Sequence, residues 1–272
     1  MKSGGLGSRL LVAAWGIPLL LGLTWLGGWW FWGLVTAIAL LAQWEYYRLQ
    51  PAIGAQPLMW LGIFGGAVIT VGWMVGGWMI PWLLALIASL LLLAGMAQHK
   101  PHRDFLATLG GVCYPPLLAG SFLVVRAWLP GEGDMGSGRM LAFAIWGAIW
   151  VGDTAAYAGG RLFGKHPLAP TVSPHKTQEG FWAGLIGAMG FGLLWWGLRL
   201  IPLDLALATG LAAGIFGQLG DLAESAIKRE AGVKDSGNLL PGHGGILDRF
   251  DSLFITAPVV ASYLLVRGFW YQ

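Results

Sequence analysis

The chain has few charged residues and almost no cysteine. Only 11% of its 272 residues are Asp, Glu, Lys or Arg, whereas 56% are hydrophobic, and its mean hydropathy is +0.66. This is not the composition of a soluble protein. The single cysteine, Cys113, excludes an intrachain disulfide and tells nothing about the redox compartment.

Apolar runs of the length that a bilayer requires recur along the whole sequence. They predict an all-α fold, a polytopic integral membrane helical bundle with about nine transmembrane helices. The 44 glycines are scattered through these runs, where small residues let helices pack closely, and they would suit a homodimer. The pairs Gly27-Gly28 and Gly76-Gly77 read as tight turns between spans. The predicted spans are 10–27, 29–48, 58–76, 78–97, 105–127, 140–159, 180–198, 204–226 and 251–268.

The Lys and Arg residues indicate the orientation, because positively charged loops stay in the cytoplasm. With a cytoplasmic N-terminus, twelve of the 16 fall on the cytoplasmic side and four outside. We therefore expect a multi-pass protein of the cell inner (cytoplasmic) membrane. The cytoplasmic set is Lys2, Arg9, Arg48, Lys100, Arg103, Arg161, Lys165, Lys176, Lys228, Arg229, Lys234 and Arg249.

The distribution of polar residues divides the predicted single membrane domain, residues 1–272, into two parts. Residues 1–139, with spans one to five, read mainly as scaffold, and Glu45 near the end of span two reads as a structural acid that pairs with Arg48. Residues 140–272, with spans six to nine, read as the catalytic part. Its cytoplasmic loops are 160–179 and 228–250.

Asp153 lies deep in the apolar sequence of span six, where an unpaired acid is costly. We expect it to face the bundle interior or a polar cavity, with packing as the alternative to a functional role. In the following basic loop, Ser173 and Lys176 are candidates to bind phosphate oxygens. Thr177 is placed to cap span seven. Basic loops are also ordinary in membrane proteins, so this loop alone decides nothing.

Charged residues are concentrated between Asp221 and Asp251. Helical spacing puts Asp221, Glu224, Ser225 and Lys228 on one face, and Asp248 and Asp251 on another. A glycine-rich loop, P-G-H-G-G, lies between them and can approach a ligand closely. Carboxylates with cations nearby suggest Mg²⁺ and polyphosphate, whereas no second His or Cys has the spacing of a zinc site. Helix-terminal ion pairs such as Glu224–Lys228 are the plain alternative.

The run S-A-I-K-R-E-A-G-V-K-D-S-G-N-L-L-P-G-H-G-G-I-L-D-R-F-D, residues 225–251, resembles the phosphatidate cytidylyltransferase (CDP-diacylglycerol synthase) family. The resemblance continues in G-D-T-A-A-Y-A-G-G-R-L-F-G-K and S-P-H-K-T-Q-E-G, and covers roughly residues 145–255. His175 and Gln178 depart from the family's usual pattern. The resemblance implies a nucleotidyltransferase of phospholipid biosynthesis that transfers the cytidylyl group of CTP to phosphatidic acid. Its products would be CDP-diacylglycerol and pyrophosphate.

The resemblance also implies the roles of individual residues. Mg²⁺ would be held by Asp221, Asp248 and Asp251, and a second, monovalent cation could accompany it. These acids and the cations Lys228, Arg229, Lys234 and Arg249 would form the catalytic set. Substrate contacts are expected from Asp153, Ser173, Lys176, Ser225, Gly242, His243, Gly244 and Gly245.

Other functions remain open at this stage. A CDP-archaeol synthase shares the chemistry on a different lipid, and a polyprenol kinase also uses CTP in a membrane. An ion-coupled transporter would show matching interrupted helices in two halves, but the charge here is concentrated in the second half. The expected partners are CTP, phosphatidic acid and the bilayer, with the site facing the cytoplasm and no nucleic acid.

Overall fold

The computed structural model describes residues 6–129 and 137–270, so Lys2 lies outside the described part. The chain forms two compact units, each made of two separate stretches. Unit 1 comprises Met1–Val124 and Ile227–Phe250, and unit 2 comprises Val125–Ala226 and Asp251–Gln272. Each unit is described by itself below, and a single membrane domain stays a prediction.

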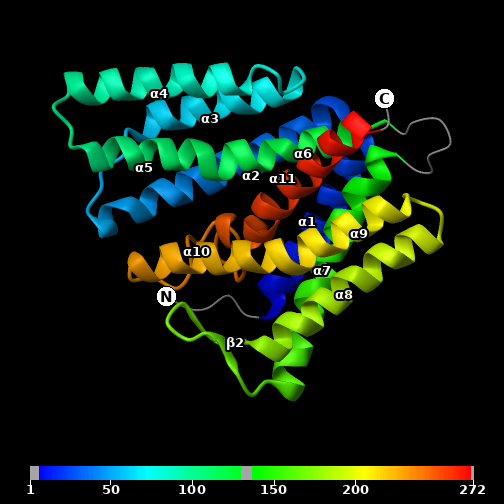
Figure 1. Ribbon diagram of the computed structural model, residues 1–272. Helices are drawn as coiled ribbons and strands as arrows, with labels where there is room; N and C mark the ends of the chain where they lie inside the picture. Colours follow the sequence, from blue (N-terminus) through cyan, green and yellow to red (C-terminus); the bar gives the residue numbers. More distant parts are fainter. Residues whose placement is uncertain (1–5, 130–136, 271–272) are drawn as a thin grey trace. The chain divides into compact units, whose positions relative to one another are not determined.

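The described chain is almost entirely helical, as predicted, and each of the nine predicted spans falls on a helix or on a continuous series of helical segments (Figure 1). The turns at Gly27-Gly28 and Gly76-Gly77 are also confirmed, because all four glycines have positive φ angles. The helical segments are α1 (Leu6–Leu26), α2 (Gly28–Leu49), η1 (Gln50–Ile53), α3 (Met59–Met74), α4 (Ile80–Ala97), α5 (His102–Val112), η2 (Cys113–Leu117), α6 (Leu118–Ala127), α7 (Gly138–Phe163), α8 (Gln178–Gly197), α9 (Leu203–Leu211), η3 (Ala212–Gly217), α10 (Gln218–Glu230) and α11 (Leu247–Trp270).

Among the described residues, six helices are long and apolar enough to cross a membrane. Two shorter apolar helices, Leu10–Leu26 and Met59–Met74, accompany them. The protein is therefore a polytopic membrane protein of the all-α class, while nine crossings and a cytoplasmic N-terminus stay predictions. Two of the six are formed by α5, η2 and α6 and by α9, η3 and α10, each joined through a π-helical segment.

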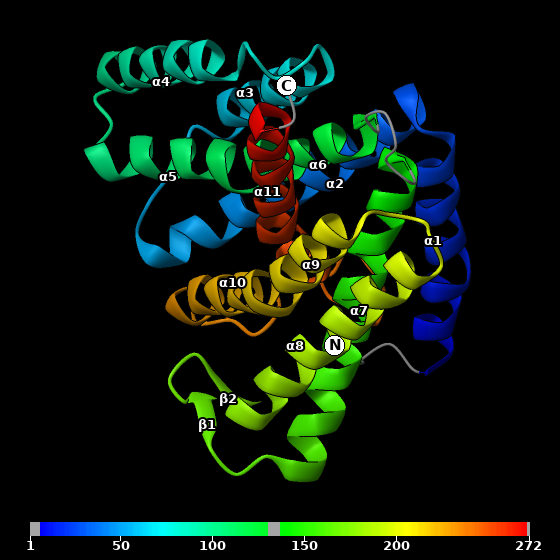
Figure 2. The same cartoon turned by 45° about the vertical axis from the view of Figure 1, so that its right-hand side comes forward.

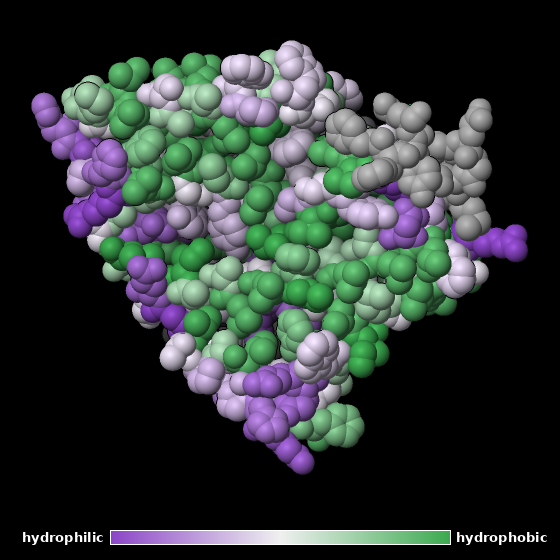
Figure 3. Space-filling model, viewed as in Figure 1, coloured by the Kyte–Doolittle hydropathy of each residue, from purple (hydrophilic) through white to green (hydrophobic). Residues whose placement is uncertain are grey.

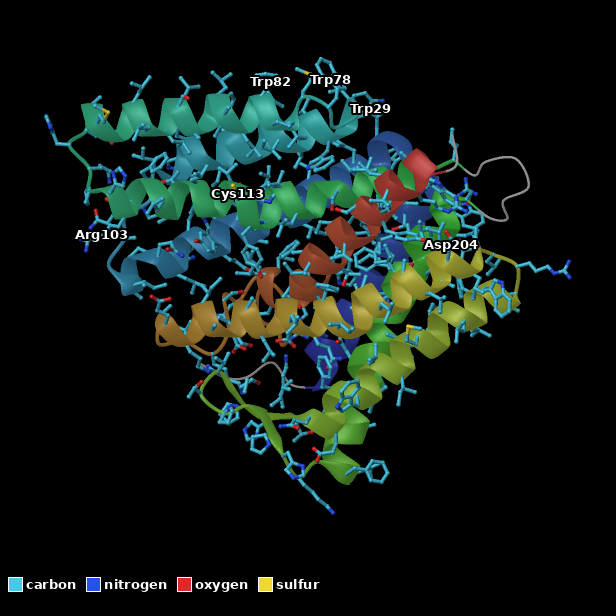
Figure 4. All side chains as sticks on the ribbon, viewed as in Figure 1. Trp29, Trp78, Trp82, Arg103, Cys113 and Asp204 are labelled. Atoms are coloured by element: carbon cyan, nitrogen blue, oxygen red, sulfur yellow. The ribbon has the colours of Figure 1, made fainter. Side chains whose placement is uncertain are left out.

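In unit 1, α2 packs on α1 and α3, and α3 packs on α4 and α5. Tyr47 fills the space above two glycines, since a Cβ on Gly62 or Gly111 would overlap its ring. Trp78 and Trp82 lie exposed at one end of α4, and Arg103 lies beyond the other end (Figure 4). Figure 3 shows hydrophobic residues over α4 and a hydrophilic edge at the turn that leads to α5. This gradient suits an apolar span with an aromatic end and a basic end.

Unit 2 is built on α8, which packs against α7 on one side and α9 on the other. Figures 1 and 2 show α7 and α8 side by side. Glycines allow these close contacts: a Cβ on Gly159 would overlap Ala183, and one on Gly192 would overlap the carbonyl of Ala206.

The loop between α7 and α8 contains a small antiparallel hairpin, which the sequence did not predict. Its strands are β1 (Pro167–Ala169) and β2 (Ser173–Thr177), and Pro167 pairs with Thr177. Thr177 then caps α8, as predicted, because its Oγ1 accepts a hydrogen bond of 3.1 Å from the Gly180 N–H. The hairpin thus leads directly into the first turn of α8.

Candidate active site

Three carboxylates converge in unit 2. Asp221 and Glu224 come from α10 and Asp251 comes from α11, and each offers an oxygen that lies within 4.8 Å of the other two. The Glu224 side chain is buried and Asp251 is only 8% exposed, whereas the side chain of Asp221 is 35% exposed. We call Asp221, Glu224 and Asp251 the acidic cluster. One of its acids is thus open to the outside while two are enclosed.

Glycine brings the two helices of the acidic cluster together. A Cβ on Gly220 would lie 2.8 Å from the backbone oxygen of Asp251, and one on Gly217 would lie 3.0 Å from Oγ1 of Thr256. Both distances are shorter than ordinary van der Waals contact. The end of η3 and the start of α10 can therefore approach α11 only because side chains are absent here.

Lys176 places a positive charge on the acidic cluster. Its Nζ lies 2.7 Å from Oδ2 of Asp221, and Oγ of Ser225 donates a 3.3 Å hydrogen bond to the other oxygen of the same carboxylate. The charges of Lys176 and of Asp153, from α7, also act on Asp251. The structure therefore brings together four predicted site residues from separate elements, with Ser225 beside them.

Asp153 does not face a packed bundle interior, because its side chain is exposed on α7. A polar cavity, the other place expected for it, stays a prediction. One turn on, the exposed Tyr157 accepts a 3.1 Å hydrogen bond from Arg161. This side of α7 therefore carries polar groups, although the span as a whole has an apolar mean hydropathy.

A second polar centre lies in unit 1, around Asp248 in the first turn of α11. Nζ of Lys228 lies 2.7 Å from Oδ1 of Asp248, and the backbone N–H groups of Ser236 and Gly245 donate to this carboxylate at 3.0 and 2.7 Å. Both charged side chains are nearly enclosed, at 11% and 5% exposure. Asp248 as a metal ligand stays a prediction, and what the structure shows is its role as the anchor of loop 231–246.

Glu45 holds the same loop from the scaffold side, and sequence reasoning missed this contact. Its buried carboxylate accepts hydrogen bonds from the Leu247 N–H at 2.8 Å and from the Ser236 hydroxyl at 3.1 Å. The structural interpretation of Glu45 is confirmed, but the predicted partner is wrong. Arg48 lies instead over the ring of Trp44. A contact across about 190 residues leaves no local pattern in the sequence.

The glycine-rich loop is shaped by these acids. A Cβ on Gly237 or Gly245 would overlap the Glu45 carboxylate, and one on Gly244 would lie 2.8 Å from Oδ2 of Asp248. Gly242 and Gly244 have φ angles of 77° and 83°, which suit glycine. Part of the glycine content thus accommodates Glu45 and Asp248, and substrate contact by Gly242, Gly244 and Gly245 stays a prediction.

The remaining predicted residues lie around the same loop or on the hairpin. Arg229 donates to the carbonyl of Val233 at 2.9 Å, and Arg249 donates to that of His243 at 2.6 Å. Lys234 is exposed, and Ser173 is partly buried at the start of β2. Their predicted contacts with substrate stay predictions.

Comparison with known proteins decides the family. The model of the cytidylyltransferase family matches residues 7–267. The chain belongs to the cytidylyltransferase family. The match covers both units. It therefore also includes the N-terminal helices, which lie outside the region of roughly residues 145–255 where the sequence resembled the family.

Several relatives of this cytidylyltransferase family member are named phosphatidate cytidylyltransferase. The Staphylococcus saprophyticus protein is 47% identical over 136 residues, 46% of this chain and 48% of its own length. The Staphylococcus haemolyticus protein is 49% identical over 127 residues, 43% of this chain and 46% of its own length. The protein of Staphylococcus aureus strain COL is 46% identical over 131 residues, 47% of this chain and 49% of its own length. The chain therefore matches about half the length of these relatives.

Glu224 is the other functional residue that sequence reasoning missed, because it entered only through the plain alternative of an ion pair with Lys228. The structure puts its carboxylate with those of Asp221 and Asp251. The three-residue spacing of Asp221 and Glu224 was the available signal, because it places both acids on one helix face.

Proposed function

We propose that this member of the cytidylyltransferase family is a phosphatidate cytidylyltransferase. It transfers the cytidylyl group of CTP to phosphatidic acid and yields CDP-diacylglycerol and pyrophosphate. The observation that carries the proposal is the acidic cluster with Lys176 beside it, in a chain built of membrane-length helices. The named relatives support the choice of nucleotide and lipid.

The reaction needs charge neutralisation more than acid–base catalysis. A non-bridging oxygen of the lipid phosphate, already an anion at neutral pH, attacks the α-phosphorus of CTP. The new P–O bond forms as the bond from that phosphorus to the oxygen bridging to the β-phosphorus breaks, and pyrophosphate leaves with the electron pair. Because both reactants are anionic, positioning and electrostatic stabilisation dominate the barrier.

The donor set of the acidic cluster fits Mg²⁺. Carboxylate oxygens are the hard ligands this ion prefers, and ligands about 2.1 Å from it on opposite sides lie about 4.2 Å apart. The 4.8 Å limit on the cluster's oxygens is compatible with one such ion. Asp221, Glu224 and Asp251 would hold it, and the bound ion would neutralise charge on the phosphate oxygens.

Residues of this chain supply the remaining functions in the proposal. Lys176 and Ser225, next to Asp221, would bind phosphate oxygens. The charge of Asp153 would contribute to the electrostatic field at the acidic cluster. Lys228 and Asp248 would fix loop 231–246 and so hold Lys234, His243 and Arg249 in place.

The distribution of Lys and Arg supports a site that faces the cytoplasm from the inner membrane, with CTP entering from the cytosol and lipid from the inner leaflet. A second, monovalent cation and a homodimer belong to the same proposal.

The test is an assay of the purified full chain in detergent with CTP, Mg²⁺ and a panel of lipids. We expect CDP-lipid and pyrophosphate with phosphatidic acid, and neither product when EDTA replaces Mg²⁺. A preference for an ether-linked archaeal lipid phosphate would indicate a CDP-archaeol synthase. Phosphorylation of a polyprenol would indicate a kinase, and ion movement without CTP turnover would indicate a transporter. Any of these three results would overturn the proposal.

A further inference from the structure

Lys176 occupies the position where a bound cation would neutralise the acidic cluster. Its ammonium nitrogen is 2.7 Å from Oδ2 of Asp221, and its charge also acts on Asp251. The side chain is only 28% exposed. A positive charge of the protein itself therefore compensates the acids.

A divalent ion at the cluster would compete with that ammonium. An ion bound to Oδ2 of Asp221 at about 2.1 Å would lie at most about 5 Å from Nζ of Lys176 if the lysine stayed in place. Two cations at this distance, partly shielded from water, repel each other strongly. Lys176 and the metal ion therefore compete for the carboxylate of Asp221.

The lysine side chain can move while its backbone stays fixed. The base of the hairpin is anchored by the Thr177 cap on α8 and by Glu179, whose Oε1 lies 2.6 Å from Nδ1 of His166. Lysine carries its charge on a flexible four-carbon stem, so rotamer changes alone displace Nζ by several ångströms. A phosphate bound to the same metal would lie within that reach.

We infer that Lys176 is an exchange cation: it neutralises Asp221 in the metal-free protein and transfers to a phosphate oxygen of the nucleoside triphosphate when a divalent ion binds. The inference rests on the proposed function for the identity of the anion, but its metal half does not depend on turnover. No covalent bond changes in this step. The exchange keeps charge balanced at Asp221 before and after the substrate arrives.

The experiment measures Mn²⁺ binding to the full chain in detergent without CTP, by electron paramagnetic resonance of free Mn²⁺. Lys176→Met should bind Mn²⁺ about tenfold more tightly than the unmodified protein, because the competing charge is gone. Lys176→Arg should stay within about threefold. The matched control is Lys165→Met, because only the backbone N–H of Lys165 contacts Glu179. It should leave the affinity unchanged.

The second measurement is the KM for CTP at saturating Mg²⁺, which Lys176→Met should raise about tenfold. Tighter metal binding with weaker CTP binding is a combination that general loss of structure does not produce. Equal or weaker Mn²⁺ binding by Lys176→Met would overturn the inference, and so would an unchanged KM for CTP.

If the chain fails to form CDP-lipid but Lys176→Met still tightens Mn²⁺ binding, the proposed function fails and the metal half of the inference stands. If Lys176→Met does not fold, Lys176→Arg decides, and a change in its Mn²⁺ affinity of tenfold or more would overturn the inference.

Discussion

Gly220 lies directly against the backbone carbonyl of Asp251, so that a Cβ at position 220 would be 2.8 Å from that oxygen. This contact sets how closely α10 approaches α11. It therefore also sets the separation of Asp221, the next residue, from Asp251. The geometry of the acidic cluster depends on a residue with no functional group of its own.

Gly220→Ala should push the two helices apart and disrupt the acidic cluster. Catalytic geometry misplaced by about 1 Å can cost about 100-fold in rate, so we expect cytidylyl transfer to fall at least tenfold. Mn²⁺ affinity should fall with it. Titration of Mn²⁺ and the CDP-lipid assay measure the two effects.

Gly190→Ala is the matched control, because a Cβ at position 190 of α8 meets nothing within 4 Å. Alanine is favoured over glycine inside helices by about 1 kcal/mol, so this variant should keep its activity, and its melting temperature should not fall. Equal behaviour of the two variants would show that the close contact at Gly220 is unimportant.

Glu45→Ala should release loop 231–246 from the scaffold of unit 1. The buried Leu247 N–H and Ser236 hydroxyl would lose their acceptor, at a cost of about 1–3 kcal/mol in the free energy of unfolding. Hydrogen exchange should become faster in peptides that cover residues 236–247. Glu45→Gln keeps an acceptor oxygen and should show a smaller effect.

Glu230→Ala, an exposed acid of the same unit, serves as the control and should leave the exchange of that loop unchanged. Unchanged exchange in Glu45→Ala as well would contradict the anchoring role of Glu45.

Lys228→Met alone should destabilise the protein more than the double variant, Lys228→Met with Asp248→Asn, does. It leaves the nearly enclosed Asp248 carboxylate without its ammonium partner, and breaking a buried pair from one side costs about 3–5 kcal/mol. Replacing both residues, as Lys228→Met with Asp248→Asn, removes the uncompensated charge. The double variant should therefore regain part of the lost stability, as measured by thermal unfolding in detergent. Additive losses would mean that the two side chains do not interact.

The sequence predicted the course of the helices well, because apolar runs, double glycines and the Thr177 cap are local signals. It did not predict the hairpin, since its short strands contain Pro167 and Pro174, residues that normally argue against strands. The helical face that carries Asp221 also predicted much of the acidic cluster.

The remaining parts of the site depend on contacts between distant segments. Glu45 meets its loop across about 190 residues, so no spacing rule could pair them. For Glu224, helical spacing gave Asp221 as a neighbour on the same face, but the approach of Asp251 depends on tertiary packing at Gly220.

The central claim is that the acidic cluster is the metal centre of cytidylyl transfer, and Glu224 tests it most directly because only the structure assigns it there. The measurement is Mg²⁺-dependent pyrophosphate release from CTP and phosphatidic acid by Glu224→Gln, with the exposed Glu230→Gln of the same helix as control. We predict a loss of at least about 100-fold in Glu224→Gln, with folded protein and a control at the unmodified rate. Turnover by Glu224→Gln near the unmodified rate would contradict the account.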